Sequence, residues 1–124
     1  MRRVKIAAVE LKVERVKGVD FLIPEGEMVV GDGDSRLKEE LDKLRSSGVA
    51  QVVVDFSKVP YIDSSVLGQL VHGYTLLKSE GGGLKLLNPC RRITDLLTIT
   101  RLITVFEIFK SREEALASYR PTAS

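Results

Sequence analysis

Two adjacent serines, Ser64 and Ser65, are the residues of this sequence that best fit a chemical role. They follow Asp63 at the predicted start of an amphipathic helix, after a β-branched apolar run and Pro60. The first backbone N–H groups of a helix have no acceptor within the helix, and the positive end of the helix dipole lies there. A phosphoryl group on a serine at this position would therefore be accommodated with little strain.

The same residues also have a purely structural interpretation. Ser and Asp are common at helix starts for reasons unrelated to function, and composition alone favours this interpretation for both serines. Asp63 is predicted to cap the helix, and it is also placed to orient a serine hydroxyl. A serine hydrolase would need His72, the only histidine, which lies two turns along the same helix without a Gly-x-Ser-x-Gly elbow.

No other stretch of the sequence supplies a catalytic, cofactor or metal site. The Gly-Asp-Gly-Asp loop at 31–34 lacks the calcium ligands at the needed offsets, and Arg36 replaces the third glycine of a dinucleotide fingerprint. One histidine and one cysteine, Cys90, cannot supply a His/Cys zinc set. The sequence therefore predicts a protein without catalytic residues, cofactor or bound metal.

Length and composition fit a small intracellular domain. A chain of 124 residues has room for one core, and a net charge of +2 is too small to favour nucleic acid or an anionic membrane as the main partner. The single cysteine excludes an internal disulfide and favours a reducing compartment. After the basic residues 1–3, charged residues interrupt the apolar stretch, and no apolar run approaches a membrane span. We expect a cytoplasmic protein with no direct membrane insertion.

Apolar periodicity predicts strands and helices that alternate along the chain. The first strand is expected at an edge of the sheet and reverses at Gly18, and the second ends at Pro24. Ser35 or Asp34 is predicted to cap the first helix. The predicted strands cover residues 9–16, 19–23, 51–56, 84–87 and 105–109, and the predicted helices cover 35–48, 64–78, a short segment after 88–89, and a segment from 113.

These elements predict an α/β fold in a single domain of residues 1–120, followed by a short tail at 121–124. The sheet is expected to be mixed and mostly parallel, with four to five strands and an N-terminal hairpin. About four helices are expected to pack on it, because short strand–helix alternation favours parallel pairing.

The segment 55–68 resembles the signature of the STAS domains, and among them the bacterial anti-sigma factor antagonists. That signature is an aspartate in the third strand, then an apolar residue, aspartate, two small or hydroxyl residues, glycine and leucine-glycine. Here Asp55 and Ile62 hold the first two positions, and Val66 replaces the usual glycine, which stiffens the backbone there. The segments 81–86, 105–109 and 113–116 also match, so the resemblance covers nearly the whole chain.

The resemblance implies a role as a protein-binding module and not as an enzyme. In such antagonists the second serine, here Ser65, is the phosphoacceptor. The unphosphorylated form binds an anti-sigma factor that is itself a serine/threonine kinase with bound ATP, so that the sigma factor is released. The kinase then phosphorylates the antagonist, and a separate serine phosphatase reverses the modification. The implied partner-binding residues are Asp63, Ser64, Ser65, Leu67, Gly68, Gly26 and Gly31.

Two alternatives to this switch stay open. A constitutive STAS adaptor, for example the soluble subunit of a membrane transport complex, would use the fold for assembly without serine phosphorylation, and Val66 is the feature that keeps this alternative open. A binder of a small ligand or nucleotide has no motif of its own in the sequence. Isolation of native partners would separate these alternatives, because a kinase supports the switch and a transporter ATPase or permease supports the adaptor.

Overall fold

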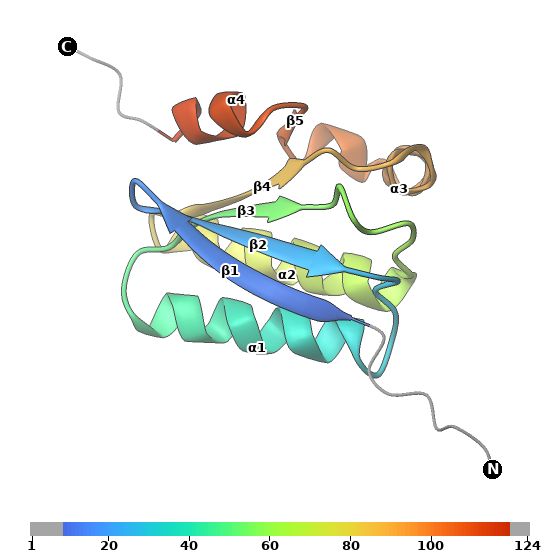
Figure 1. Ribbon diagram of the computed structural model, residues 1–124, viewed down its shortest axis with the longest axis horizontal. Helices are drawn as coiled ribbons and strands as arrows, with labels where there is room; N and C mark the ends of the chain where they lie inside the picture. Colours follow the sequence, from blue (N-terminus) through green and yellow to red (C-terminus); the bar gives the residue numbers. More distant parts are fainter. Residues whose placement is uncertain (1–8, 120–124) are drawn as a thin grey trace.

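The computed structural model describes residues 9–119. A five-stranded sheet is flanked by helices, and strands and helices alternate after an initial hairpin (Figure 1). The tail expected at 121–124 and the basic N-terminal residues lie outside the described part of the chain. The elements are β1 (Glu10–Val16), β2 (Val19–Glu25), α1 (Gly33–Ser46), β3 (Gln51–Asp55), α2 (Ser64–Ser79), β4 (Gly83–Leu87), α3 (Arg91–Ile99), the 3₁₀ turn η1 (Leu102–Thr104), β5 (Ile108–Phe109) and α4 (Arg112–Ala117).

The sheet is mixed and has the strand order β1-β2-β3-β4-β5. β1 and β2 are antiparallel, whereas β2 to β5 run parallel to one another. The hairpin turns at Lys17 and Gly18, whose φ angles are 51° and 84°. Two left-handed residues are what a two-residue hairpin needs to match the twist of its strands. The predicted fold class, with its N-terminal hairpin and edge strand, is confirmed.

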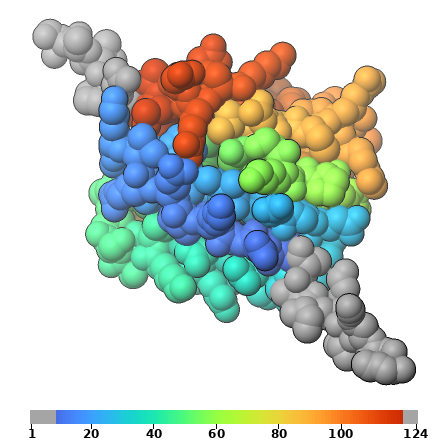
Figure 2. Space-filling model, viewed as in Figure 1, coloured from blue at the N-terminus to red at the C-terminus, as the bar shows by residue number. Residues whose placement is uncertain are grey.

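Two apolar cores lie on the two faces of the sheet. The larger core includes buried residues of α1, α2 and α3. In Figure 1, α1 and α2 lie on one side of the sheet and α4 covers part of the other. In β3, Val52 and Val54 belong to the larger core and Val53 to the smaller one, as expected from the alternation of side chains along a strand. Figure 2 shows the strands of the hairpin at the surface, between α1 and α4.

The helices bury the apolar stripes that the sequence predicts. Each stripe faces the sheet with a period of three to four residues, and the opposite helix face is in solvent. The fully or almost fully buried stripe residues are Leu37, Leu41, Leu67, Leu70 and Leu77.

The last strand is shorter than the predicted segment 105–109, and that prediction is wrong in its first three residues. β5 contains only Ile108 and Phe109. The chain is still turning before it, since the N–H groups of Val105 and Phe106 donate to the carbonyl of Leu102. Phe106 is buried and packs edge-to-face on Tyr74 of α2, with 5.3 Å between ring centres. The apolar residues that predicted a strand therefore close the core beside α2.

The other boundaries differ from the predicted ones by one or two residues, and two of these differences have a clear structural reason. β2 continues through Pro24 to Glu25. Pro24 is tolerated because the parallel ladder to β3 stops at Leu22, so the missing N–H interrupts no further pairing on that side. α1 begins at Gly33, before the predicted caps, and its N-cap residue makes no side-chain capping bond. Only glycine fits at residue 33, because a Cβ there would lie 2.7 Å from the Cα of Met28.

Candidate functional site

The start of α2 is fixed by the side chain of Asp63. One carboxylate oxygen, Oδ1, accepts hydrogen bonds from the N–H groups of Ser65 and Val66, each at 3.1 Å. These contacts make Asp63 the N-cap of the helix, as predicted. The other oxygen, Oδ2, accepts the N–H of Val30 at 2.8 Å. One aspartate therefore caps α2 and also holds the loop between β2 and α1.

Backbone contacts bring this loop to the start of α2. Met28 forms a parallel bridge with Ile62, its N–H donates to the carbonyl of Tyr61, and its carbonyl accepts the N–H of Asp63. The loops that follow β2 and β3 therefore lie side by side at the same end of the sheet (Figure 1). The carboxyl ends of parallel strands are where α/β proteins commonly place their sites.

The hydroxyl of Ser65 points to α1 and not to its own cap. Its Oγ donates a hydrogen bond to Oδ2 of Asp34 at 2.5 Å. The other oxygen of Asp34 accepts the N–H groups of Gly31 and Ser35, both at 2.8 Å. The hydroxyl of Ser65, followed by these two N–H groups, lowers the pKa of the Asp34 carboxyl against the opposing effect of desolvation. Asp34 is therefore an ionised acceptor at neutral pH.

Asp34 is a residue of the site that the sequence did not place correctly. It was predicted, as an alternative to Ser35, to cap α1, but it lies inside the first turn and binds a residue 31 positions away. The two helix starts must be packed together before this contact exists. The only local signal was the acidic, glycine-rich character of residues 31–34, which fits a polar loop of many kinds.

Ser64 has a different environment from Ser65. It is exposed and lines a groove of about 510 Å³ between α2 and η1. Leu67, Val71 and Leu102 give this groove an apolar floor. The rest of its lining consists of Gly68, His72 and Thr75.

The structure brings most of the predicted partner-binding residues together. Ser64, Leu67 and Gly68 line the α2 groove, and Asp63 and Ser65 hold the neighbouring loop. Gly31 is an exposed part of that loop, has a φ of 98° and donates to Asp34. Gly26 lies in the same pair of loops, where its N–H donates to the carbonyl of Lys58.

Val66 lies inside the protein. Its side chain is fully buried in the larger core, and its N–H donates to Asp63. In the first turn of α2, Ser64 thus faces the groove, Ser65 faces α1 and Val66 faces the core. The departure from the family pattern at residue 66 changes the core packing and leaves the exposed surface of the turn without an added side chain.

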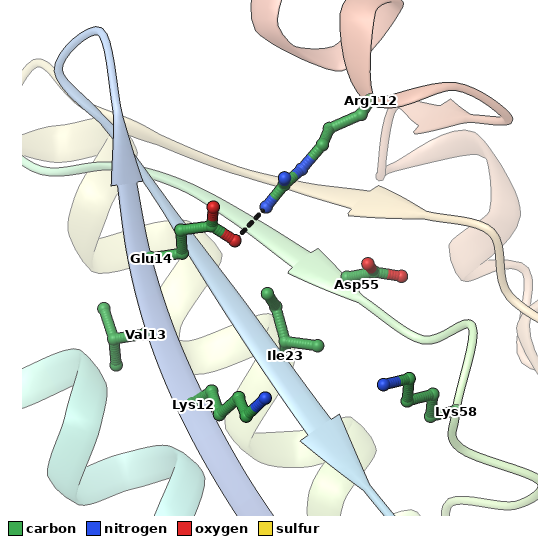
Figure 3. Close-up of a pocket in the computed structure, with 7 residues that line it drawn as sticks. All are labelled: Lys12, Val13, Glu14, Ile23, Asp55, Lys58 and Arg112. Atoms are coloured by element: carbon green, nitrogen blue, oxygen red, sulfur yellow. Dashed lines mark hydrogen bonds and ion pairs between the residues drawn. The ribbon is translucent and has the colours of Figure 1, made fainter.

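A second groove, of about 680 Å³, lies on the α4 side of the sheet (Figure 3). The carboxylate of Glu14 accepts a hydrogen bond from Arg112 at 2.7 Å, and that of Asp55 accepts from Ser57. The side chains of Lys12 and Lys58 point toward each other across this groove (Figure 3). Apart from Asp55, the groove contains none of the signature residues.

The described residues contain no cluster of three or more His, Cys, Asp or Glu side chains that could hold a metal ion. Within residues 9–119 no helix is both long enough and apolar enough to cross a membrane.

A mixed sheet opened by a hairpin, with a capped helix that carries two serines at its start, is the arrangement of an α/β domain of the STAS type. Residues 10–115 match the family model of the STAS domain, and the chain belongs to this family.

Relatives within the family are named as anti-sigma factor antagonists. One from Thermotoga neapolitana is 30% identical over 101 residues, which are 82% of this chain and 89% of the relative. The anti-sigma-B factor antagonist of Bacillus subtilis is 35% identical over 77 residues, which are 62% of this chain and 70% of the relative. The crystal structure of an antagonist from Thermotoga maritima has a TM-score of 0.83 at 25% identity, over 90% of this chain and 95% of that one.

Proposed function

We propose that this protein is an anti-sigma factor antagonist controlled by phosphorylation at Ser65. Unphosphorylated, it binds an anti-sigma factor with serine/threonine kinase activity in the cytoplasm. Phosphorylation by that kinase ends the binding, and a serine phosphatase restores it. The observation that carries the proposal is the half-buried Ser65 hydroxyl, held at the capped start of α2 in a chain whose relatives are named as such antagonists.

The geometry supports control by charge. The N–H groups of Ser65 and Val66 are already bonded to Asp63, so a phosphate would find few free donors at the helix start. Asp34 and Asp63 both place carboxylates beside the residue that would carry it. A phosphoserine adds about −1.5 to −2 charges at pH 7, and this local surface would become strongly anionic. A partner with an acidic group or nucleotide phosphate opposite would be repelled.

The neighbouring surface supports protein binding. Val30 is 66% exposed on the loop held by Asp63, although it is a large apolar residue. The groove beside Ser64 adds the apolar surface of Leu67 and Val71. Apolar residues of a protein interface are typically surrounded by polar ones, as they are here.

The first test identifies the partner and the modified residue. Tagged protein is purified from its native host, its partners are identified, and the site of phosphorylation is mapped after incubation with the recovered kinase and ATP. We expect a kinase as partner and phosphate on Ser65, with Ser65→Ala abolishing the modification and Ser64→Ala keeping most of it. A transporter ATPase or permease as the partner, without phosphate on Ser65, would support the constitutive adaptor.

The second test measures the switch by titration calorimetry. Burying an uncompensated charge at an interface costs about 2–5 kcal/mol, which corresponds to roughly 30-fold or more in affinity. We expect Ser65→Ala to bind like the wild type, and the phosphorylated protein and Ser65→Asp to bind at least that much more weakly. Thermal melts run in parallel separate weaker binding from unfolding: the phosphorylated protein and Ser65→Asp should stay folded at the titration temperature but melt somewhat lower, because the added charge faces Asp34 and Asp63. Equal affinities of all forms would contradict the switch.

A further inference from the structure

The hydroxyl of Ser65 is held by a residue from a different helix. Asp34 lies in the first turn of α1, and its Oδ2 accepts the Ser65 hydroxyl at 2.5 Å. An ionised carboxylate can only accept, so the hydroxyl proton must point to Asp34. The remaining lone pairs of Ser65 Oγ then point away from α1.

Asp34 is itself fixed in place. Its second carboxylate oxygen accepts the N–H groups of Gly31 and Ser35. The loop that carries Gly31 is anchored in turn, because Asp63 accepts the N–H of Val30. The carboxylate that accepts the Ser65 hydroxyl is therefore held in place by the backbone and is not a freely rotating surface side chain.

Ser64 has no comparable acceptor. None of residues 9–119 accepts a hydrogen bond from its hydroxyl, and the residue is exposed on the α2 groove. Its hydroxyl can rotate among its staggered positions in contact with water. The hydroxyl of Ser65 is therefore held in one orientation and that of Ser64 is free to rotate, although both residues lie in the same helical turn.

We propose that Asp34 is the positioning residue that presents Ser65, and not Ser64, for phosphorylation. The proposal rests on the function proposed above. In the transfer, Ser65 Oγ bonds to the γ-phosphorus of the kinase-bound ATP while the bond from that phosphorus to the leaving ADP oxygen breaks. The hydroxyl proton leaves to a carboxylate base of the kinase, and Asp34 acts only through the hydrogen bond that holds the Ser65 side chain in place. A held hydroxyl needs no further ordering in the complex, and this is the kind of gain that correct orientation gives to a group-transfer reaction.

Asp34→Asn is the informative variant, and Asp32→Asn is its matched control. The asparagine keeps an oxygen for Gly31 and Ser35, but its amide nitrogen replaces the oxygen that faces Ser65. Asp32 carries a charge on the same loop, bonds to the N–H of Val9 and does not contact Ser65. Both variants therefore lose one negative charge, and only one of them removes the acceptor of the hydroxyl.

The first measurement needs no kinase. The Asp34 carboxyl is titrated by ¹³C NMR in the wild type and in Ser65→Ala. We expect a pKa below the ordinary value of 3.8 in the wild type and a higher pKa in Ser65→Ala. The same titration in both proteins would overturn the proposed contact and the positioning role with it.

The second measurement is the rate and site of phosphorylation by the recovered kinase. Asp34→Asn should be modified about tenfold more slowly, the scale of a hydrogen bond to a charged group, and with a larger share of phosphate on Ser64. Asp32→Asn should match the wild type. Equal rates and sites in Asp34→Asn and the wild type would overturn the positioning role and leave the switch intact. A wild type that no recovered kinase modifies would overturn the switch and the positioning role together.

Discussion

Val66 illustrates how closely core and surface roles are combined in the first turn of α2. Its side chain is fully buried, whereas Ser64, two residues earlier, is exposed. One face of the turn thus stabilises the fold while the other presents the hydroxyl groups. Replacement of the usual glycine by valine adds apolar burial and removes backbone freedom in the unfolded chain, and both effects favour the folded state.

We predict that Val66→Ala lowers the free energy of unfolding by about 1–3 kcal/mol, because it removes buried methyl groups and leaves a cavity. Val66→Gly should cost about 1 kcal/mol more, since glycine is the poorer helix former. Urea denaturation of the two variants provides the measurement. Ser64→Ala is the control at the exposed side of the turn, where a change within about 0.5 kcal/mol is expected. An unchanged stability of Val66→Ala would contradict the packing described for this residue.

Among the elements, the contact between the β2–α1 loop and the start of α2 has the largest consequence for the site. Asp63 bonds both to its own helix and to Val30, and Asp34 bonds both to its own loop and to Ser65. Each segment thus contributes one carboxylate that accepts a hydrogen bond from the other segment. A displacement of either segment would disturb the environment of the Ser65 hydroxyl.

Two substitutions at Asp63 separate its two roles. Asp63→Ala removes the cap and should cost about 0.5–2 kcal/mol of stability. Asp63→Asn keeps an oxygen for the helix N–H groups, because Asn caps as well as Asp, but its amide nitrogen cannot accept the N–H of Val30. Asp63→Asn should therefore unfold near the wild-type midpoint and show faster hydrogen exchange at Val30. If exchange at Val30 were unchanged in Asp63→Asn, the proposed link to the loop would be wrong.

The elements that the sequence predicted well are those with a local signal. The apolar stripe of α2 and the valine run of β3 depend on residues close in the chain, as does the capping of a helix by Asp63. The pairing of Ser65 with Asp34 depends on the packing of two helix starts, and no periodicity records it. The same limitation explains why the last strand was predicted too long. Phe106 is a residue type that favours strands, but here it packs on Tyr74 of a distant helix.

At the scale of the whole molecule, ion pairs join elements that are far apart in the sequence. Arg112 at the start of α4 bonds to Glu14 of β1 at 2.7 Å, and its guanidinium lies 4.4 Å from the ring centre of Phe21. Arg45 near the end of α1 bonds to Glu80 at the end of α2 at 2.6 Å. These contacts connect the edge strand β1 to α4, and α1 to α2. Each places an acidic residue beside a guanidinium.

The partners lower the pKa values of these carboxyl groups. The hydrogen bond from Arg112 is the main cause for Glu14, that from Arg45 for Glu80, and that from Lys38 for Asp42. A group whose pKa is lower in the folded state binds fewer protons there than in the unfolded chain. Its contribution is therefore complete above the unfolded pKa and is lost as the pH falls through the folded pKa. The ordinary values of 4.5 for Glu and 3.8 for Asp set the upper limit of this pH window.

We predict that stability is nearly constant from pH 7 to about pH 5 and decreases steadily below about pH 4.5, as the lowered carboxyl groups take up protons. Urea midpoints measured from pH 7 to pH 3 test this at low and high salt. Added salt should reduce the acid dependence, because exposed ion pairs are screened. Arg112→Gln is the control. It also loses the contact with Phe21, so its stability is lower at every pH, but its profile should be less steep than that of the wild type, since Glu14 then titrates near its ordinary value. A wild type that becomes more stable as the pH falls, or an unaltered slope in Arg112→Gln, would contradict the role of these pairs.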